Sequence, residues 1–210
     1  MFKKLNFKIN DQLIKKINYL SKFIDKGSVL YRDDTIDFKF KRYPKDTDED
    51  KLFQQYADKY TIYKQVDFAY SPILSVIPKS LLDLEVPKIH WQVFDGGSLV
   101  PPHIDKGRIS TINLYTQVNG EKTLVYSKLR NGARLETENG IITNESFIPE
   151  WIVETGSFVA NQWDFYLLNV SRPHAVINMT SNRRISISFS FYKTTFENIM
   201  DACNVQETEV

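Results

Sequence analysis

Hydrophobic residues follow one period in the first part of this chain and another in the rest. Over residues 1–85 the apolar positions recur at helical spacing. One predicted helix begins at Asn10 or Asp11 and a second covers residues 53–60. From about Lys88 the period changes to two, which predicts β-strands. We therefore expect a helical N-terminal part followed by a β-rich remainder.

The β-rich part contains several short alternating segments, and turn signals such as Asp95-Gly96-Gly97 and Asn119-Gly120 separate most of them. The predicted strands cover residues 90–94, 110–115, 123–126, 157–160, 165–169, 175–179 and 185–191. Many short strands after helices are typical of a β-sandwich or barrel whose helices cover one sheet. We expect one domain with three parts, which are a helical part at 1–85, a β-rich core at 86–194 and a short C-terminal helix or tail at 195–210.

A long polar segment at residues 130–150 interrupts the strands, and it contains two Asn-Gly pairs. Connections of this length often cover a site. We expect this segment to lie over the open end of the barrel and to help select the substrate.

Composition and net charge narrow the kinds of molecule that this protein is expected to bind. The chain has 210 residues, 42% hydrophobic and 25% charged, which is ordinary for a soluble globular protein. A net charge of +1 gives no bulk attraction to nucleic acids or membrane surfaces, so we expect neither as a partner. The single Cys203 excludes an internal disulfide and suits a reducing compartment, from which we expect a cytoplasmic protein.

Two of the three histidines stand where one metal site would need them. His103 and Asp105 form a His-x-Asp triplet on the same side of an extended segment, and His174 precedes a later predicted strand. Two imidazoles and one carboxylate can occupy one face of an octahedral ion, as in non-haem Fe(II) oxygenases. We predict that these three residues bind Fe(II). The alternative is that both histidines are surface or hydrogen-bonded residues beside prolines; His90, which has no partner at ligand spacing, is expected to be structural.

The predicted strand from Arg184 to Phe191 has two chemically different faces. Its four apolar residues would pack beneath the helices, whereas Arg184 and three serines point the other way. A buried guanidinium is costly unless it meets an anion, and it can grip a carboxylate bidentately. We predict that Arg184 and Ser186 bind the far carboxylate of a 2-oxoglutarate that chelates the iron, while Arg183 has the opposite parity and lies outside. The alternative is an edge strand with a solvated serine face.

Residues 91–191 resemble the Fe(II)/2-oxoglutarate-dependent oxygenases, most closely the prolyl 4-hydroxylase-like branch. The shared pattern runs from a strand and a glycine turn through Pro-His-x-Asp to a final His and Arg about ten residues apart. The matching residues are Gly96, Gly97, His103, Asp105, Arg108, Thr111, Tyr115, Gly120, Thr123, His174 and Arg184. One departure is Phe94, which stands about where several members carry a tyrosine.

The resemblance implies a mainly β protein with N-terminal helices and a double-stranded β-helix (jelly-roll, cupin-like) core. It implies a dioxygenase that uses Fe(II), O2 and the cosubstrate 2-oxoglutarate, which is converted to succinate and CO2. We expect hydroxylation of an unactivated C–H bond in a small molecule or a peptidyl residue. It also assigns Tyr115 a share in binding the far carboxylate, although Tyr115 equally fits a core aromatic position.

Two other functions remain open. A cupin-like metalloenzyme with the same three metal ligands would not use 2-oxoglutarate and would have no need for Arg184 beside Ser186. A non-catalytic binding module could also have kept the fold.

Overall fold

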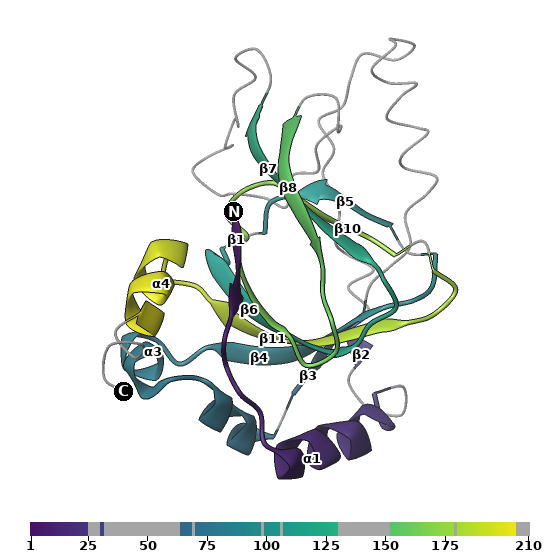
Figure 1. Ribbon diagram of the computed structural model, residues 1–210, viewed down its shortest axis with the longest axis vertical. Coiled ribbons are helices and arrows are strands. Elements are labelled where there is room, and N and C mark those ends of the chain that lie inside the picture. The colour runs from purple at the N-terminus through teal and green to yellow at the C-terminus, as the bar shows by residue number, and fades with distance from the viewer. Residues whose placement is uncertain are drawn as a thin grey trace.

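Two facing antiparallel β-sheets form the body of the molecule in the computed structural model (Figure 1). The structure describes residues 1–24, 30–31, 64–68, 70–97, 99–105, 107–129, 152–178 and 180–204. The larger sheet has the order β1-β9-β6-β11-β4-β3-β2, and the smaller has the order β5-β10-β7-β8. The strands are β1 (Phe2–Leu5), β2 (Leu30–Tyr31), β3 (Lys64–Asp67), β4 (Lys88–Phe94), β5 (Leu99–His103), β6 (Ser110–Gln117), β7 (Lys122–Leu129), β8 (Ile152–Val159), β9 (Phe165–Asn169), β10 (His174–Ile177) and β11 (Arg184–Phe191).

The strands from β4 through β11 pair in a nested order. The first strand of this run pairs with the last, β4 with β11, and inside it β5 pairs with β10, β6 with β9, and β7 with β8. Such a run behaves as one long hairpin wound over itself, with its strands shared between the two sheets. This is the double-stranded β-helix, or jelly roll, so the predicted fold class is confirmed.

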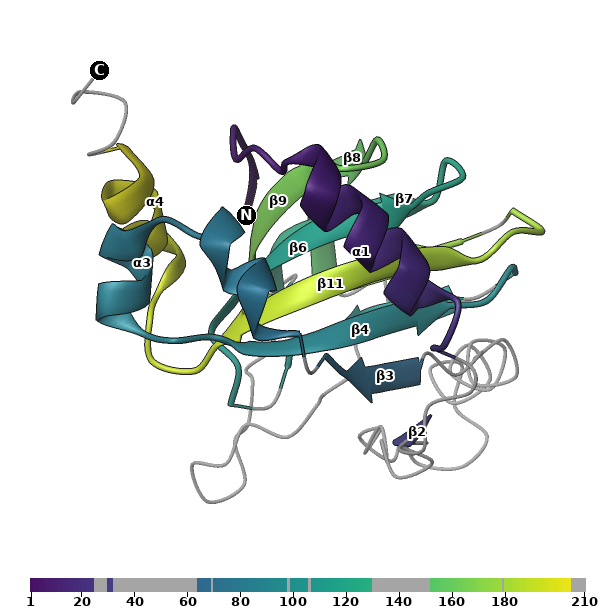
Figure 2. The same ribbon diagram turned by 90° about the horizontal axis from the view of Figure 1, so that it is seen from below.

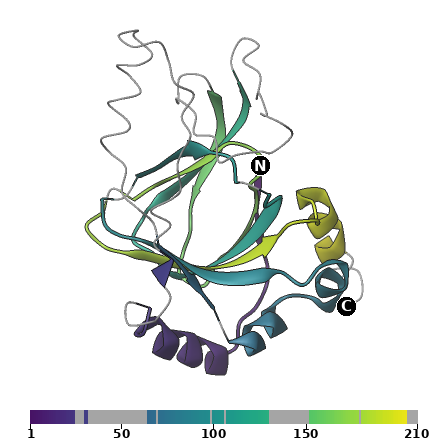
Figure 3. The ribbon, with the colours of Figure 1, turned by 180° about the vertical axis from the view of Figure 1, so that it is seen from behind.

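The described helices lie on the outer side of the larger sheet, and Figure 2 shows α1 crossing that face. They are α1 (Asp11–Ser21), the 3-10 helix η1 (Ser71–Val76), α3 (Lys79–Leu84) and α4 (Phe196–Asn204). Asn10 caps α1 as predicted, because its side-chain oxygen accepts a hydrogen bond from the Leu13 amide at 2.9 Å. Seen from behind, the same layering leaves the smaller sheet without a described helix over it (Figure 3). No helix in the described part of the chain combines the length and apolar character needed to cross a membrane.

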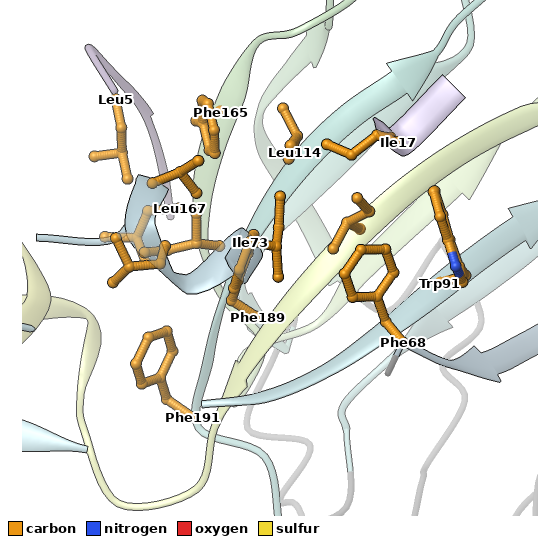
Figure 4. Close-up of a cluster of buried hydrophobic side chains, with 14 of the residues drawn as sticks. Leu5, Ile17, Phe68, Ile73, Trp91, Leu114, Phe165, Leu167, Phe189 and Phe191 are labelled. Atoms are coloured by element: carbon orange, nitrogen blue, oxygen red, sulfur yellow. The ribbon is translucent and has the colours of Figure 1, made fainter. Parts of the chain in front are cut away.

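The main hydrophobic core fills the layer between the helices and the larger sheet (Figure 4). From β11, Ile187 and Phe189 are fully buried there, together with Ile17 of α1 and Ile73 of η1. The apolar face of β11 therefore packs beneath the helices, as its alternation predicts. The opposite face of the strand is turned toward the smaller sheet.

The N-terminal part is not purely helical, which corrects the description of residues 1–85. β1 pairs with β9 and β3 pairs with β4, so both extend the larger sheet beyond the jelly-roll strands. β1 is an edge strand whose central Lys3 and Lys4 are exposed, and this protects an edge from further pairing. Such a short charged strand has little apolar alternation to reveal it. The predicted helix at 53–60 and the predicted lid at 130–150 lie outside the described residues.

The turn from β4 into β5 is built on glycine. Gly97 has a φ of +76°, and a Cβ on Gly96 would come within 2.4 Å of the Ser181 backbone. β5 then carries Pro101 and Pro102, which cannot donate to a ladder. They are tolerated because β5 is one of the two edge strands of the smaller sheet. This turn delivers His103 to the strand end where the site is formed.

Candidate metal centre

His103 and His174 face each other across two paired strands. His103 ends β5 and His174 begins β10, and the two residues are direct partners in the antiparallel register. Their ring centroids lie 4.3 Å apart. Asp105 follows β5 and is held by its backbone amide, which donates to the Val170 carbonyl at 3.1 Å. The fold thus brings together three residues that are up to 71 positions apart in the sequence.

The three side chains converge on one point. The Nε2 atom of His103 lies 3.4 Å from Oδ1 of Asp105, and Nε2 of His174 lies 3.8 Å from Oδ2. One ligand atom from each residue falls within 4.8 Å of the others, and all three residues are buried. Among the described residues this is the one such group of histidine, cysteine or acidic side chains.

The donor set fits a divalent transition metal. Two imidazole nitrogens and one carboxylate oxygen form the facial triad of non-haem Fe(II) sites, with three coordination positions left open. Neighbouring ligands at about 2.1 Å from an ion lie about 3 Å apart, so a metal would draw these groups slightly inward. His103, Asp105 and His174 could therefore hold a divalent transition metal.

Electrostatics keep the ligands in their binding forms. Burial and the neighbouring His103 lower the pKa of His174 to about 3, so its ring is neutral near pH 7. Its Nδ1–H donates to the Arg172 carbonyl at 3.0 Å, which leaves the Nε2 lone pair facing the site. Burial alone would raise the pKa of Asp105, but the Arg108 guanidinium and both histidines hold it below its usual range.

Arg108 supports the carboxylate ligand. It donates through Nε to Oδ2 of Asp105 at 2.8 Å and contacts the same oxygen through Nη2. Its Nη1 donates to Ser190 at 3.0 Å and lies 3.3 Å from Nε2 of His90. Because Arg108 holds Oδ2, Oδ1 is left for a metal. The family pattern in the sequence contains Arg108 but does not predict that it supports Asp105. Nothing in the sequence indicated that the buried His90 belongs to the same network.

The two histidines and Arg184 line one cavity between the sheets. Thr123 of β7 also lines it and accepts a contact from Nη1 of Arg184 at 3.4 Å. Apolar side chains contribute Val100, Leu168, Val170 and Val176 to the same lining. Strand parity predicted that Arg184 points inward, and the residue is 1% exposed in that position.

Aromatic side chains surround the Arg184 guanidinium. Its carbon lies 4.9 Å from the Phe94 ring centroid and 4.8 Å from that of Tyr115. Nη2 of Arg184 donates to the Tyr115 hydroxyl at 3.1 Å. Phe94 is the cross-strand partner of Arg184. Although it has no hydroxyl, it therefore contacts the guanidinium through its ring. Ser186 is placed differently, since its hydroxyl lies 3.5 Å from Oε1 of Gln92. Neither Ser186 nor Tyr115 is among the cavity-lining residues described.

A residue that sequence reasoning missed lies next to Arg184. Glu121 is 2% exposed, and its Oε1 atom is 3.6 Å from Nε of Arg184. The segment Asn119-Gly120-Glu121 was interpreted only as a turn. Glu121 shares strand parity with Thr123, and this alternation was the available signal that its carboxylate could point inward.

Comparison with known proteins supports the fold. No protein-family model matches the sequence, and no curated protein matches it. Among solved structures, the non-haem α-ketoglutarate-dependent epimerase SnoN from nogalamycin biosynthesis is 12% identical with a TM-score of 0.53, covering 89% of this chain and 76% of that chain. The Escherichia coli ribosomal oxygenase YcfD is 14% identical with a TM-score of 0.40 over 72% of this chain. This chain spans 38% of the YcfD chain.

Loss of any one ligand should abolish metal binding. We expect His103→Ala, Asp105→Asn and His174→Ala each to lose stoichiometric binding of Fe(II) under anaerobic conditions, because each alanine removes a donor and the asparagine removes the carboxylate charge. Metal content by elemental analysis measures this. Asp95→Asn is the matched control, because Asp95 pairs with Arg183 at 2.8 Å and lies outside the triad. The Asp95→Asn variant should bind metal like the wild type. Full binding by His174→Ala would contradict the assignment.

The metal-free protein should become less stable as the pH is lowered below 6.5. The pKa values of His90 and His174 are lowered from 6.5 to about 3 in the folded protein. Below pH 6.5 the unfolded chain takes up protons that the folded protein does not, so the free energy of unfolding decreases. Each histidine contributes about 1.4 kcal/mol per pH unit at most. Urea unfolding between pH 6.5 and 5 measures the slope, which His90→Gln should reduce by about half. A pH-independent stability would contradict these buried, neutral histidines.

Proposed function

We propose that this protein is an Fe(II)- and 2-oxoglutarate-dependent dioxygenase. One observation carries the proposal, which is that His103, His174 and Arg184 line a single cavity between the two sheets. A 2-oxo dicarboxylate needs a metal for its oxo acid end and a cation for its far carboxylate. A fold neighbour, SnoN, is described as α-ketoglutarate-dependent, which agrees with this proposal.

Each end of the cavity has its own task. When bound, Fe(II) supplies the O2 chemistry and the chelation of the 2-oxo acid. Arg108 fixes the Asp105 carboxylate, and the Arg172 carbonyl fixes the tautomer of His174. At the other end, the guanidinium of Arg184 and the hydroxyl of Tyr115 offer donors to the far carboxylate. The apolar lining from both sheets keeps water away from the reacting centre.

Charge balance is consistent with a dianionic cosubstrate. Counted as ionised, the buried Asp105 and Glu121 contribute two negative charges, and Arg108 and Arg184 contribute two positive charges. These four charges cancel, so a divalent metal leaves the site with two positive charges. A 2-oxo dicarboxylate carries two negative charges and restores neutrality. We propose an unactivated C–H bond of a small molecule or peptidyl residue as the position oxidised, as the prolyl 4-hydroxylase-like pattern suggests.

A cupin-like metalloenzyme that does not use 2-oxoglutarate is the second candidate. The observation in its favour is the 3.6 Å approach of Glu121 to Arg184. Because this carboxylate already neutralises the guanidinium, Arg184 does not require a cosubstrate to be buried. The two candidates differ in whether the cavity binds and consumes 2-oxoglutarate.

Turnover without a substrate separates these candidates. We expect purified protein with Fe(II) and O2 to convert 2-oxoglutarate slowly to succinate and CO2, and His174→Ala to produce none. Arg184→Gln should weaken 2-oxoglutarate binding on the order of a hundredfold, because a bidentate charged contact is lost. Its affinity for Fe(II) alone should scarcely change, since Arg184 is no ligand.

Arg183→Gln is the matched control for the arginine variant. Arg183 lies one position earlier, points away from the cavity and pairs with Asp95. Succinate yield and calorimetric titration measure the two effects. A protein that binds Fe(II) but neither binds nor consumes 2-oxoglutarate would favour the cupin-like alternative.

A further inference from the structure

Glu121 and Arg184 form a buried ion pair that is not hydrogen-bonded. Both residues are at most 2% exposed, and Oε1 of Glu121 lies 3.6 Å from Nε of Arg184. Neither of these two atoms has a hydrogen-bond partner among the residues that the structure describes. Burying such groups is costly unless they are paired and hydrogen-bonded. The two charges therefore compensate each other, but no hydrogen bond joins the carboxylate to the guanidinium.

The surface pair next to it provides a comparison. Arg183 and Asp95 also meet through Nε and a carboxylate oxygen, at 2.8 Å, although both are partly exposed. A purely structural ion pair at the buried position would gain more from the same short contact, since water does not compete there. The longer separation of Glu121 and Arg184 thus indicates that other contacts hold them apart.

Those contacts can be identified on both sides. The second carboxylate oxygen of Glu121 accepts a hydrogen bond from the Asn119 amide at 2.8 Å, in a turn where Gly120 has a φ of +85°. The guanidinium of Arg184 is held by the hydroxyls of Tyr115 and Thr123. Glu121 consequently approaches the Nε edge, while Nη1 and Nη2 remain on the side of the two hydroxyls.

We propose that Glu121 is a resident counter-ion that sets the affinity of the cavity for dicarboxylates. This inference rests on the proposed function, in which the far carboxylate of 2-oxoglutarate binds Arg184. With no dicarboxylate bound, Glu121 neutralises the guanidinium and makes its burial tolerable. When a dicarboxylate binds, two carboxylates share one guanidinium and repel each other. The same repulsion acts on the product succinate, which also carries a far carboxylate, and promotes its release.

The substitution Glu121→Gln tests this role. Glutamine has nearly the same size and can still accept from the Asn119 amide, but it removes the negative charge. We expect Mn(II)-loaded Glu121→Gln to bind succinate and 2-oxoglutarate on the order of tenfold more tightly than the wild type, because the repulsion is gone. Binding of 2-oxobutyrate, which has no far carboxylate, should be unchanged. Isothermal titration calorimetry measures all three ligands.

The matched control is Glu154→Gln. Glu154 lies on β8, its side chain is 46% exposed and it is 3.9 Å from Lys122, so solvent screens its charge. The same change of charge there should leave all three affinities as in the wild type. Tightening by Glu154→Gln equal to that by Glu121→Gln would show a general charge effect and overturn the inference.

Thermal unfolding gives a second measurement. Without ligand, Glu121→Gln should melt several degrees below the wild type, because Arg184 has lost its buried counter-ion. Saturating succinate should raise its melting temperature more than that of the wild type, since the ligand then supplies the missing charge. A variant that folds only with succinate present would support the inference, and one that stays unfolded even then would overturn it.

Failure of the inference and failure of the proposed function are distinguishable. Wild-type protein that binds dicarboxylates, together with a Glu121→Gln variant that binds them equally or more weakly, overturns the counter-ion role and leaves the proposed function intact. Mn(II)-loaded wild-type protein that binds neither succinate nor 2-oxoglutarate overturns both.

Discussion

The antiparallel pairing of β5 with β10 is the constraint on which the site depends. This register sets His103 opposite His174 and turns both rings toward the inside of the jelly roll. The glycine turn before β5 and the proline-bearing edge strand bring the chain to this register, and Asp105 follows it directly. Because side chains alternate along a strand, a slip of one residue would turn His103 to the other face and remove a donor. Strand pairing in the smaller sheet therefore determines whether the protein can hold a metal.

The interior of the roll has balanced charges at both ends of the cavity. Near the histidines, Arg108 neutralises Asp105 and holds one of its two carboxylate oxygens. At the other end, Glu121 compensates Arg184 without closing a hydrogen bond. This arrangement lets a buried, polar cavity exist before any ligand arrives. If a divalent metal binds as proposed, its two positive charges favour a ligand with two negative charges.

Much of this structure is readable from alternation alone. The two faces of β11 follow directly from parity, with Ile187 beneath the helices and Arg184 inside the roll. The short charged strand β1 escaped because its edge position depends on pairing with β9, a tertiary contact. The support that Arg108 gives to Asp105 depends on side-chain geometry that a linear pattern does not encode. Glu121 was hidden because a turn sequence explains its neighbours without reference to Arg184.

A crystal structure of the protein with Mn(II) and 2-oxoglutarate, recorded with anomalous scattering from the metal, tests the central claim most directly. That claim is that one cavity binds a metal at the triad and a dicarboxylate at the arginine. The account predicts an anomalous peak within about 2.3 Å of the ligand atoms of His103, Asp105 and His174. It also predicts the far carboxylate of 2-oxoglutarate against Nη1 and Nη2 of Arg184. A metal bound elsewhere, or a dicarboxylate outside this cavity, would contradict it.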